Sequence, residues 1–181
     1  MGNIADIRQQ KIDFGNDLGA DQDGLWSFSL AFYDRPDVAE ALIALQDKAG
    51  LNVNLILFAI WLGLSGRGRL DASRLGAAER AVHAIEIKLI RPLRALRRWL
   101  KSLPDPDIQA LRERIKRIEI DAEKLAQTRL GALAGAVSGA DQSDRLADAE
   151  ANLLGYLGVE HQASQQAAVI CRELHLWATN R

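Results

Sequence analysis

Several acidic and histidine side chains have spacings that metal or acid–base sites use. Glu79, His83 and Glu86 are four and three residues apart, which places them on one face of a helix. Di-iron proteins of the ferritin-like class carry Glu-x-x-His motifs on paired helices, and this chain has no second copy of such a motif. The spacing therefore favours a surface ion cluster over a metal site.

The single cysteine of the chain, Cys171, stands four residues before His175. Two ligands do not make a zinc site, and His161 would have to join them across a loop. We interpret Cys171 as a buried thiol near a helix end.

Three aspartates share a face of a predicted helix near the C-terminus. Asp141, Asp144 and Asp148 could hold Mg²⁺, but no second acidic motif faces them, and aspartates near a helix N-terminus are favoured by capping alone. The chain also has no phosphate-binding loop and no nucleophile elbow. The sequence therefore predicts no metal and no cofactor, and it argues against an enzyme.

The charges of the chain are concentrated in its middle. The formal net charge is −1, but it is −5 for residues 1–66, +8 for residues 67–117 and −4 for residues 118–181. Most cations in the helix predicted around Pro92 lie on the side away from its leucines, with Arg97 at the edge. We call these cations the basic face: Lys88, Arg91, Arg94, Arg97, Arg98 and Lys101.

This basic face has two interpretations. Several guanidinium groups along about 20 Å of helix suit the phosphates or carboxylates of a partner. The same cations can instead be solvated, or can be paired with acidic helices of this protein. The sequence leaves both interpretations open.

Two amides near strongly apolar segments mark a candidate pocket. If Gln46 and Asn54 are buried, each must hydrogen-bond to a loop backbone or to a ligand, because an unpaired buried amide costs about 1–3 kcal/mol. Aromatic residues at helical spacing could line a pocket beside these amides, or could pack in the core. The candidate pocket residues are Trp26, Tyr33, Gln46, Asn54, Phe58 and Trp61.

The hydrophobic spacing predicts an all-α fold, a compact multi-helix bundle of six to seven helices. Proline, glycine and Asn, Asp or Ser residues mark the predicted ends of these helices. The shorter helices are expected at about 25–33, from Pro36 to Gly50, at about 52–64 with Asn52 as N-cap, at about 141–157 and at about 161–178.

The remaining helices form a long predicted hairpin, at about 72–102 and 106–133, with a kink or a break at Pro92. Each arm has an apolar strip, and we expect the second arm to pack on its neighbour. The strips consist of Val82, Ile85, Leu89, Leu93, Leu96 and Leu100 on the first arm, and of Leu111, Ile115, Ile118, Ala122 and Leu125 on the second.

Composition bounds the organisation of the chain. Residues 1–23 are polar and predict an N-terminal arm, and residues 24–181 predict a single helical domain. With 48% apolar residues the chain is not disordered, and one cysteine excludes an intramolecular disulfide. No signal peptide is visible, and the most apolar stretch, residues 51–64, spans about 21 Å, too short for a bilayer. We expect a soluble, cytoplasmic protein without a membrane span.

Several distinctive motifs occur in the N-terminal half. They are L-W-x-F-S-L from Leu25, L-Q-D from Leu45, G-x-N-V-N-L-x-L-F-x-x-W from Gly50 and P-L-R-x-L-R-R-x-L-K at residues 92–101. Over roughly residues 25–101 the chain resembles an uncharacterised family of short bacterial proteins. The resemblance implies no activity and no catalytic residue.

We expect a non-enzymatic helical interaction or adaptor module that binds an acidic protein partner through the basic face. One alternative is RNA or ribosome association through the same cations. The other is a small-molecule enzyme or carrier with a pocket near Trp26, Gln46, Asn54 and Trp61. The sequence leaves the oligomeric state open.

Overall fold

The computed structural model describes residues 24–138 and 141–179, and over these residues the chain is all-helical, as the sequence predicts. The predicted arm at residues 1–23 lies outside them. The helices are α1 (Gly24–Tyr33), α2 (Val38–Ala49), α3 (Val53–Leu64), α4 (Ala72–Ile85), the π-helical turn η2 (Glu86–Ile90), α5 (Arg91–Leu100), α6 (Pro106–Gly131), α7 (Gln142–Leu157) and α8 (Gln165–Thr179).

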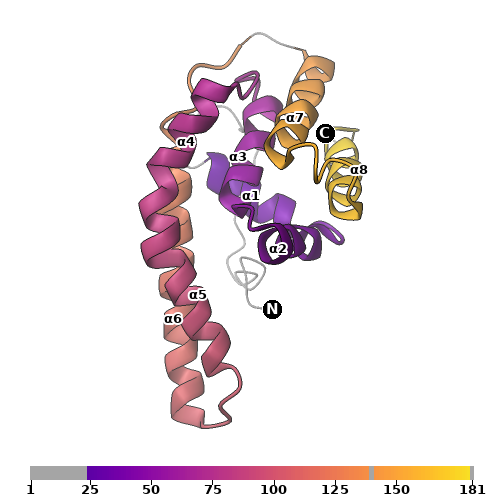
Figure 1. Cartoon of the computed structure of the whole chain (residues 1–181). Coiled ribbons are helices and arrows are strands. Elements are labelled where there is room, and N and C mark those ends of the chain that lie inside the picture. The colour runs from indigo at the N-terminus through magenta and orange to yellow at the C-terminus, as the bar shows by residue number, and fades with distance from the viewer. Residues whose placement is uncertain (1–23, 139–140, 180–181) are drawn as a thin grey trace.

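Helix α3 lies at the centre of the body and is buried along nearly its whole length (Figure 1). As predicted, Asn52 is its N-cap, and the side-chain oxygen of Asn52 accepts from the backbone N–H of Asn54 at 2.9 Å. Helix α7 packs along α3 so closely that a Cβ atom on Gly63 would lie 2.1 Å from the backbone nitrogen of Ala149. Only glycine permits this approach of two helix backbones.

The turn between α1 and α2 differs from the prediction. We expected α2 to begin with Pro36, but the helix begins at Val38, after Asp37 in the left-handed conformation with a φ of 62°. The chain must turn between the two helices, and aspartate tolerates this conformation better than most residues. The predicted end of α2 is confirmed, because Gly50 is left-handed and its N–H donates to the carbonyl of Gln46.

Helices α7 and α8 complete the body, with α8 packed on α2 and α7. Asp141 is the N-cap of α7, where its carboxylate accepts from the backbone N–H of Asp144 at 3.0 Å. Gly158 ends α7 with a φ of 69°. Among the helices described, none combines the length and the apolar character needed to cross a bilayer.

The predicted hairpin projects from this body (Figure 1). Its first arm runs continuously through α4, η2 and α5, and its second arm is α6, which begins at Pro106 with Asp105 as its N-cap. The disturbance expected at Pro92 takes the form of the π-helical turn η2 immediately before it. Proline cannot donate a hydrogen bond to the carbonyl four residues earlier and its ring crowds that carbonyl, so the wider turn accommodates it.

The two apolar strips of the hairpin are only partly buried. Val82, Ile85, Leu100, Ile115 and Ala122 are buried, as an interface between the arms requires. The second arm packs on the first, as expected. Five members of the strips nevertheless reach solvent: Leu89, Leu96, Leu111, Ile118 and Leu125 are between 38% and 51% exposed. The buried side of the hairpin also holds charged residues, among them Arg94 and Glu119.

Candidate functional site

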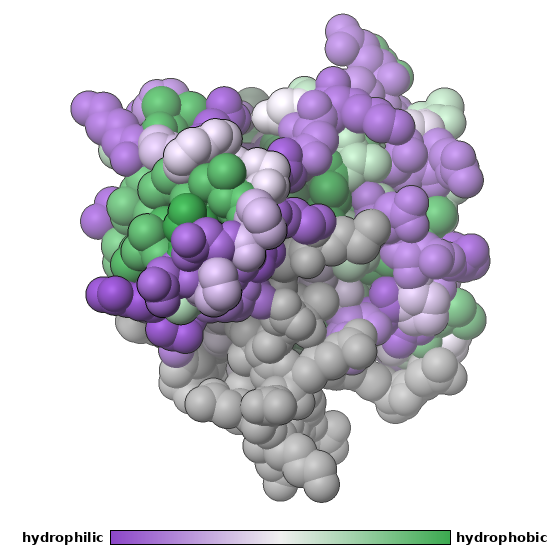
Figure 2. Space-filling view, turned by 90° about the horizontal axis from the view of Figure 1, so that it is seen from below, coloured by the Kyte–Doolittle hydropathy of each residue, from purple (hydrophilic) through white to green (hydrophobic). Residues whose placement is uncertain are grey.

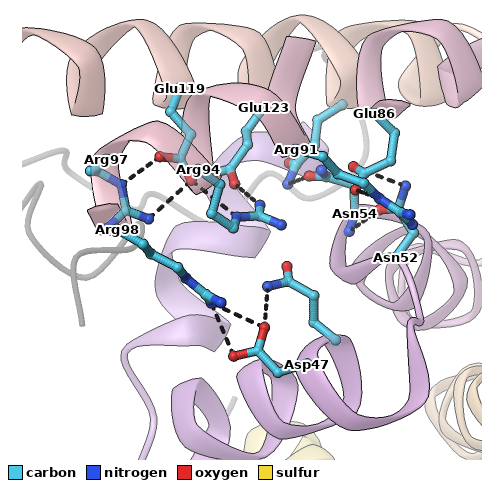
Figure 3. Close-up of polar contacts among 12 residues, drawn as sticks. Asp47, Asn52, Asn54, Glu86, Arg91, Arg94, Arg97, Arg98, Glu119 and Glu123 are labelled. Atoms are coloured by element: carbon cyan, nitrogen blue, oxygen red, sulfur yellow. Dashed lines mark hydrogen bonds and ion pairs between the residues drawn. The ribbon is translucent and has the colours of Figure 1, made fainter. Parts of the chain in front are cut away.

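The most concentrated polar chemistry in the described structure lies where the hairpin meets the body (Figure 3). Two arginines of the basic face, Arg94 and Arg97, point from α5 toward α6 and are buried. Their partners are Glu119 and Glu123, which lie one helical turn apart on α6 and are also buried. Four buried charged side chains therefore join the two arms of the hairpin.

The geometry of this buried cluster is close and branched. Arg94 donates from Nε to Glu119 at 3.1 Å and from Nη2 to Glu123 at 2.8 Å, so one guanidinium bridges both carboxylates. Arg97 donates from Nε and Nη2 to the two oxygens of Glu119, at 2.5 and 3.1 Å. Such bidentate, charge-assisted hydrogen bonds offset much of the cost of burying the charges.

Burial shifts the titration of this cluster. Desolvation raises the pKa of Glu123 to about 7, although Arg94 counteracts the shift. Desolvation also lowers the pKa of Arg94, but the charges of Glu123 and Glu119 outweigh it, so the pKa of Arg94 lies above its ordinary value. Arg94 is therefore positively charged, and Glu123 changes its charge near neutral pH.

A second pair connects the hairpin to α2. Nη2 of Arg98 lies 3.0 Å from both carboxylate oxygens of Asp47, and Gln46 donates to the same carboxylate at 3.2 Å. Desolvation alone would raise the pKa of Asp47, but the hydrogen bonds from Arg98 and Gln46 lower it below its ordinary value. Because both side chains of the pair are about half exposed, this contact contributes far less to stability than the buried cluster.

A third connection reaches the start of α3. Arg91 donates to Glu86 at 3.0 Å, and the same glutamate accepts from the Nδ2 of Asn52 at 3.3 Å. The backbone N–H of Asn52 donates to the hydroxyl of Tyr156 at 3.1 Å. Burial raises the pKa of Tyr156 to about 12, so its hydroxyl stays neutral. These contacts fix η2 against the body.

The structure therefore divides the basic face. Arg94 and Arg97 serve the interior, and this corresponds to the second interpretation of the sequence, pairing with acidic residues of the same chain. The other four cations are exposed, and two of them have an ion-pair partner, Arg91 with Glu86 and Arg98 with Asp47. Lys88 and Lys101 form no ion pair with any residue that the structure describes.

The aromatic residues of the candidate pocket belong to the hydrophobic core or pack against it. Tyr33, Phe58 and Trp61 are fully buried in the hydrophobic core, and Trp26 packs against it. The guanidinium of Arg67 lies 4.6 Å from the ring centre of Trp61. These four aromatic residues are used in packing.

The two amides have partners within the chain. Gln46 is only partly buried and donates to Asp47. Asn54 is buried, and its side-chain oxygen accepts from the Nε2 of Gln127 on α6 at 2.9 Å. The side-chain oxygen of Asn54 therefore bonds to another buried side-chain amide and not to a loop backbone.

The candidate metal ligands are likewise separated or used structurally. Among the described residues no group of three His, Cys, Asp or Glu side chains could hold a metal ion. Glu86 is buried and forms an ion pair with the exposed Arg91, whereas His83 is exposed. His175 lies 3.5 Å from Glu150, and burial raises the pKa of Cys171, which keeps this thiol protonated.

Sequence reasoning missed the acidic half of the buried cluster. Glu119, Glu123 and Gln127 are four residues apart and lie on one face of α6, next to the apolar strip. This regular spacing of polar residues was a usable signal, but only the apolar residues of this helix were assigned to its packing face. Sequence reasoning also missed a cleft of about 490 Å³ between α2 and α8, with Asp37, Lys48 and Arg172 in its lining.

The comparisons with known proteins agree with the resemblance seen in the N-terminal half. No curated protein and no solved structure matches the chain. The family model described as "Protein of unknown function (DUF2390)" matches residues 24–130, which run from the start of α1 to the last turn of α6. The chain thus belongs to the DUF2390 family.

Proposed function

We propose that this protein is a non-enzymatic interaction or adaptor module that binds an acidic segment of another protein. The binding groups are the exposed part of the basic face, Lys88, Arg91, Arg98 and Lys101. The observation that carries the proposal is the division of the basic face, in which buried glutamates hold two arginines while four cations remain at the surface of a projecting hairpin.

The buried cluster supports this role by holding the hairpin in one position. Arg94, Glu119 and Glu123 join α5 to α6. Arg98 connects α5 to Asp47 of the body, and Glu86 connects η2 to Asn52 of the body. A rigid arm presents its cations without the entropic cost of ordering them on binding. The exposed lysines of this arm carry compact charges on flexible stems. They can therefore pair with the flexible, solvated carboxylates of an acidic segment.

The charges around the exposed cations favour a protein over a nucleic acid. Asp47 and Glu86 neutralise two of the exposed arginines, which reduces the number of free cations that a run of phosphates could use. Nucleic-acid binders gain affinity by neutralising many phosphates, and within the basic face only Lys88 and Lys101 lack an ion pair with a described residue. RNA or ribosome association is thus the weaker alternative.

The enzyme or carrier alternative also receives less support. Its central residue, Asn54, is paired with Gln127, and the aromatic residues beside it belong to the core. We further propose a cytoplasmic location in a bacterial cell. A lone cysteine suits a reducing compartment, and the motifs of the N-terminal half resemble a bacterial family.

The test is capture of partners from a native bacterial lysate by three folded proteins. They are the wild type, Lys88→Glu/Lys101→Glu, and the control Arg80→Glu/Lys124→Glu, which makes the same charge change at exposed positions outside the basic face. We expect the wild type and the control to recover the same proteins with acidic segments, and the first variant to recover about tenfold less.

Nuclease treatment and salt distinguish binding of an acidic protein from binding of RNA. Recovery that disappears after ribonuclease treatment, and that falls steeply with salt concentration, would replace the proposal with RNA binding. Equal recovery by all three proteins would contradict the use of the basic face by any partner.

A further inference from the structure

The hairpin has a second face, which is apolar and exposed. On α6 the side chains of Leu111, Ile118 and Leu125 are 45%, 51% and 44% exposed. They are seven residues apart, the repeat with which a helix packs along another helix. We call these three residues the outer face of α6.

The outer face points away from the buried cluster. Glu119 and Glu123 are rotated around α6 by about 100–140° from the outer face. On α5, Leu96 is rotated by a similar angle from Arg94 and Arg97, and it is also exposed. Because these arginines and glutamates meet, the exposed apolar residues of both arms lie on the opposite side of the hairpin. Figure 2 views the hairpin from its lower end and shows hydrophobic residues there, on the left, with hydrophilic residues around them.

Charged residues accompany the outer face along its length. Asp107, Arg114, Asp121 and Arg129 follow one another at seven- or eight-residue intervals, with alternating sign. All four are exposed, and within the described part of the chain none of them forms an ion pair. Neighbours in this series are more than 10 Å apart along the helix axis, at 1.5 Å per residue, so they cannot neutralise one another within one α6.

We infer that the outer face binds a second copy of this chain, with the two α6 helices antiparallel and a two-fold axis passing at Ile118. About this axis every residue of the outer face meets another residue of that face, and each of the four charges in the series lies opposite a charge of the other sign or within one residue of it. Leu111 is as far before Ile118 as Leu125 is after it, so each meets the other on the partner helix. The pairs across the axis are Ile118 with Ile118, Leu111 with Leu125, Arg114 with Asp121, and Asp107 with Arg129.

This mirror arrangement of charges is what favours a second copy over an unrelated partner. To bind an unrelated helix, α6 would need an apolar outer face, but this face would not need to be complementary to itself. The same antiparallel alignment stacks α5 on its counterpart, which covers Leu89 and Leu96 and produces a four-helix arrangement. The interface uses the side of the hairpin opposite the buried cluster and does not depend on the proposed function.

The first test measures the mass of the full-length protein by sedimentation equilibrium across a wide concentration range. We expect the wild type to sediment at twice the chain mass. Ile118→Glu brings two carboxylates together at the axis, and we expect it to weaken association by about 100-fold or more. The control is Val159→Glu, which changes another exposed apolar residue, 86% exposed and outside the hairpin, and it should leave the dimer intact.

A charge exchange tests the alignment itself. Arg114→Glu places like charges across the interface and should weaken the dimer by about tenfold, and Asp121→Arg should do the same. The double variant Arg114→Glu/Asp121→Arg restores opposite charges and should recover most of the wild-type affinity. Circular dichroism confirms that each variant is folded.

Three results would overturn the inference. They are a wild type that stays monomeric throughout the concentration range, a dimer that Ile118→Glu does not weaken, and a double charge exchange that adds the two losses instead of recovering affinity. The second result would place the dimer contact elsewhere on the molecule.

Discussion

Arg94 and Glu123 form a buried ion pair with 2.8 Å between Nη2 and Oε1, although the two residues belong to opposite arms of a hairpin that projects from the body. The same guanidinium bonds to Glu119, which in turn holds Arg97. The charges that join the hairpin are therefore not available to a partner, and the surface chemistry of this arm belongs to its other cations.

Removing the shared arginine should be costly. Arg94→Ala leaves Glu123 without its arginine and Glu119 with one instead of two, so we expect the free energy of unfolding to fall by about 3–5 kcal/mol. Urea denaturation followed by circular dichroism measures the change. The control Arg98→Ala breaks a half-exposed pair with Asp47 and should cost about 1 kcal/mol or less. Similar losses in the two variants would contradict the structural role of the cluster.

The raised pKa of Glu123 makes stability depend on pH in a defined direction. The ordinary value is 4.5 and burial raises it to about 7, so the folded state holds this proton more tightly than the unfolded state does. The resulting stabilisation is present below about pH 4.5 and is lost as the pH rises through 7.

Glu123→Gln replaces the titrating carboxyl group with a neutral amide. As the pH rises from about 5 to about 8, the free energy of unfolding of the variant should therefore fall less than that of the wild type. Denaturant titrations at several pH values check this. Glu160→Gln, at an exposed position, should follow the wild type. If the stability of Glu123→Gln had the same pH dependence as that of the wild type, titration of Glu123 would not be its cause.

The contact between α3 and α7 depends on a glycine, Gly63, which has no side chain. Gly63→Ala would place Cβ 2.1 Å from the backbone nitrogen of Ala149, so the helices must separate, and we expect a loss of several kcal/mol, about 3 or more. Gly155→Ala is the matched control, because nothing lies within 4 Å of its added Cβ. That control should be neutral or should raise stability by up to about 1 kcal/mol through helix propensity. Thermal unfolding distinguishes the two, and a well-tolerated Gly63→Ala would contradict the close packing.

The buried amide pair should behave as a unit. Asn54→Ala leaves the Nε2 of Gln127 without its acceptor and should cost about 1–3 kcal/mol. In a double-mutant cycle with Gln127→Leu, we expect the double variant to lose less stability than the sum of the single losses, because neither partner then remains unpaired. Additive losses would show that the two amides do not interact.

Much of the fold could be predicted from the sequence because its signals are local. Asn52, Asp105 and Gly50 mark helix ends through their own backbone preferences, and each is where the pattern placed it. Pro36 was misplaced because the geometry of the turn into α2 depends on how α1 and α2 pack, which is not a local property.

The candidate site was harder to predict because its contacts are distant in the sequence. Helical spacing grouped Arg94 with Arg98, but only the packing of α6 against α5 decides that Arg94 is buried while Arg98 is exposed. Spacing likewise grouped Ile118 with Ile115 in one apolar strip, although only Ile115 is buried. A helical pattern identifies a face, but it does not identify what covers that face.

The central claim, that the exposed cations and not the buried ones contact a partner, is tested most directly by covalent footprinting. Lysines and arginines are modified in the free protein and in the captured complex, and the modified positions are read by mass spectrometry. We predict that Lys88 and Lys101 lose reactivity on binding, that Lys124 is unchanged, and that Arg94 and Arg97 are unreactive in both states, because they are buried. Lys88 and Lys101 that react equally in both states, or a reactive Arg94 in the free protein, would contradict it.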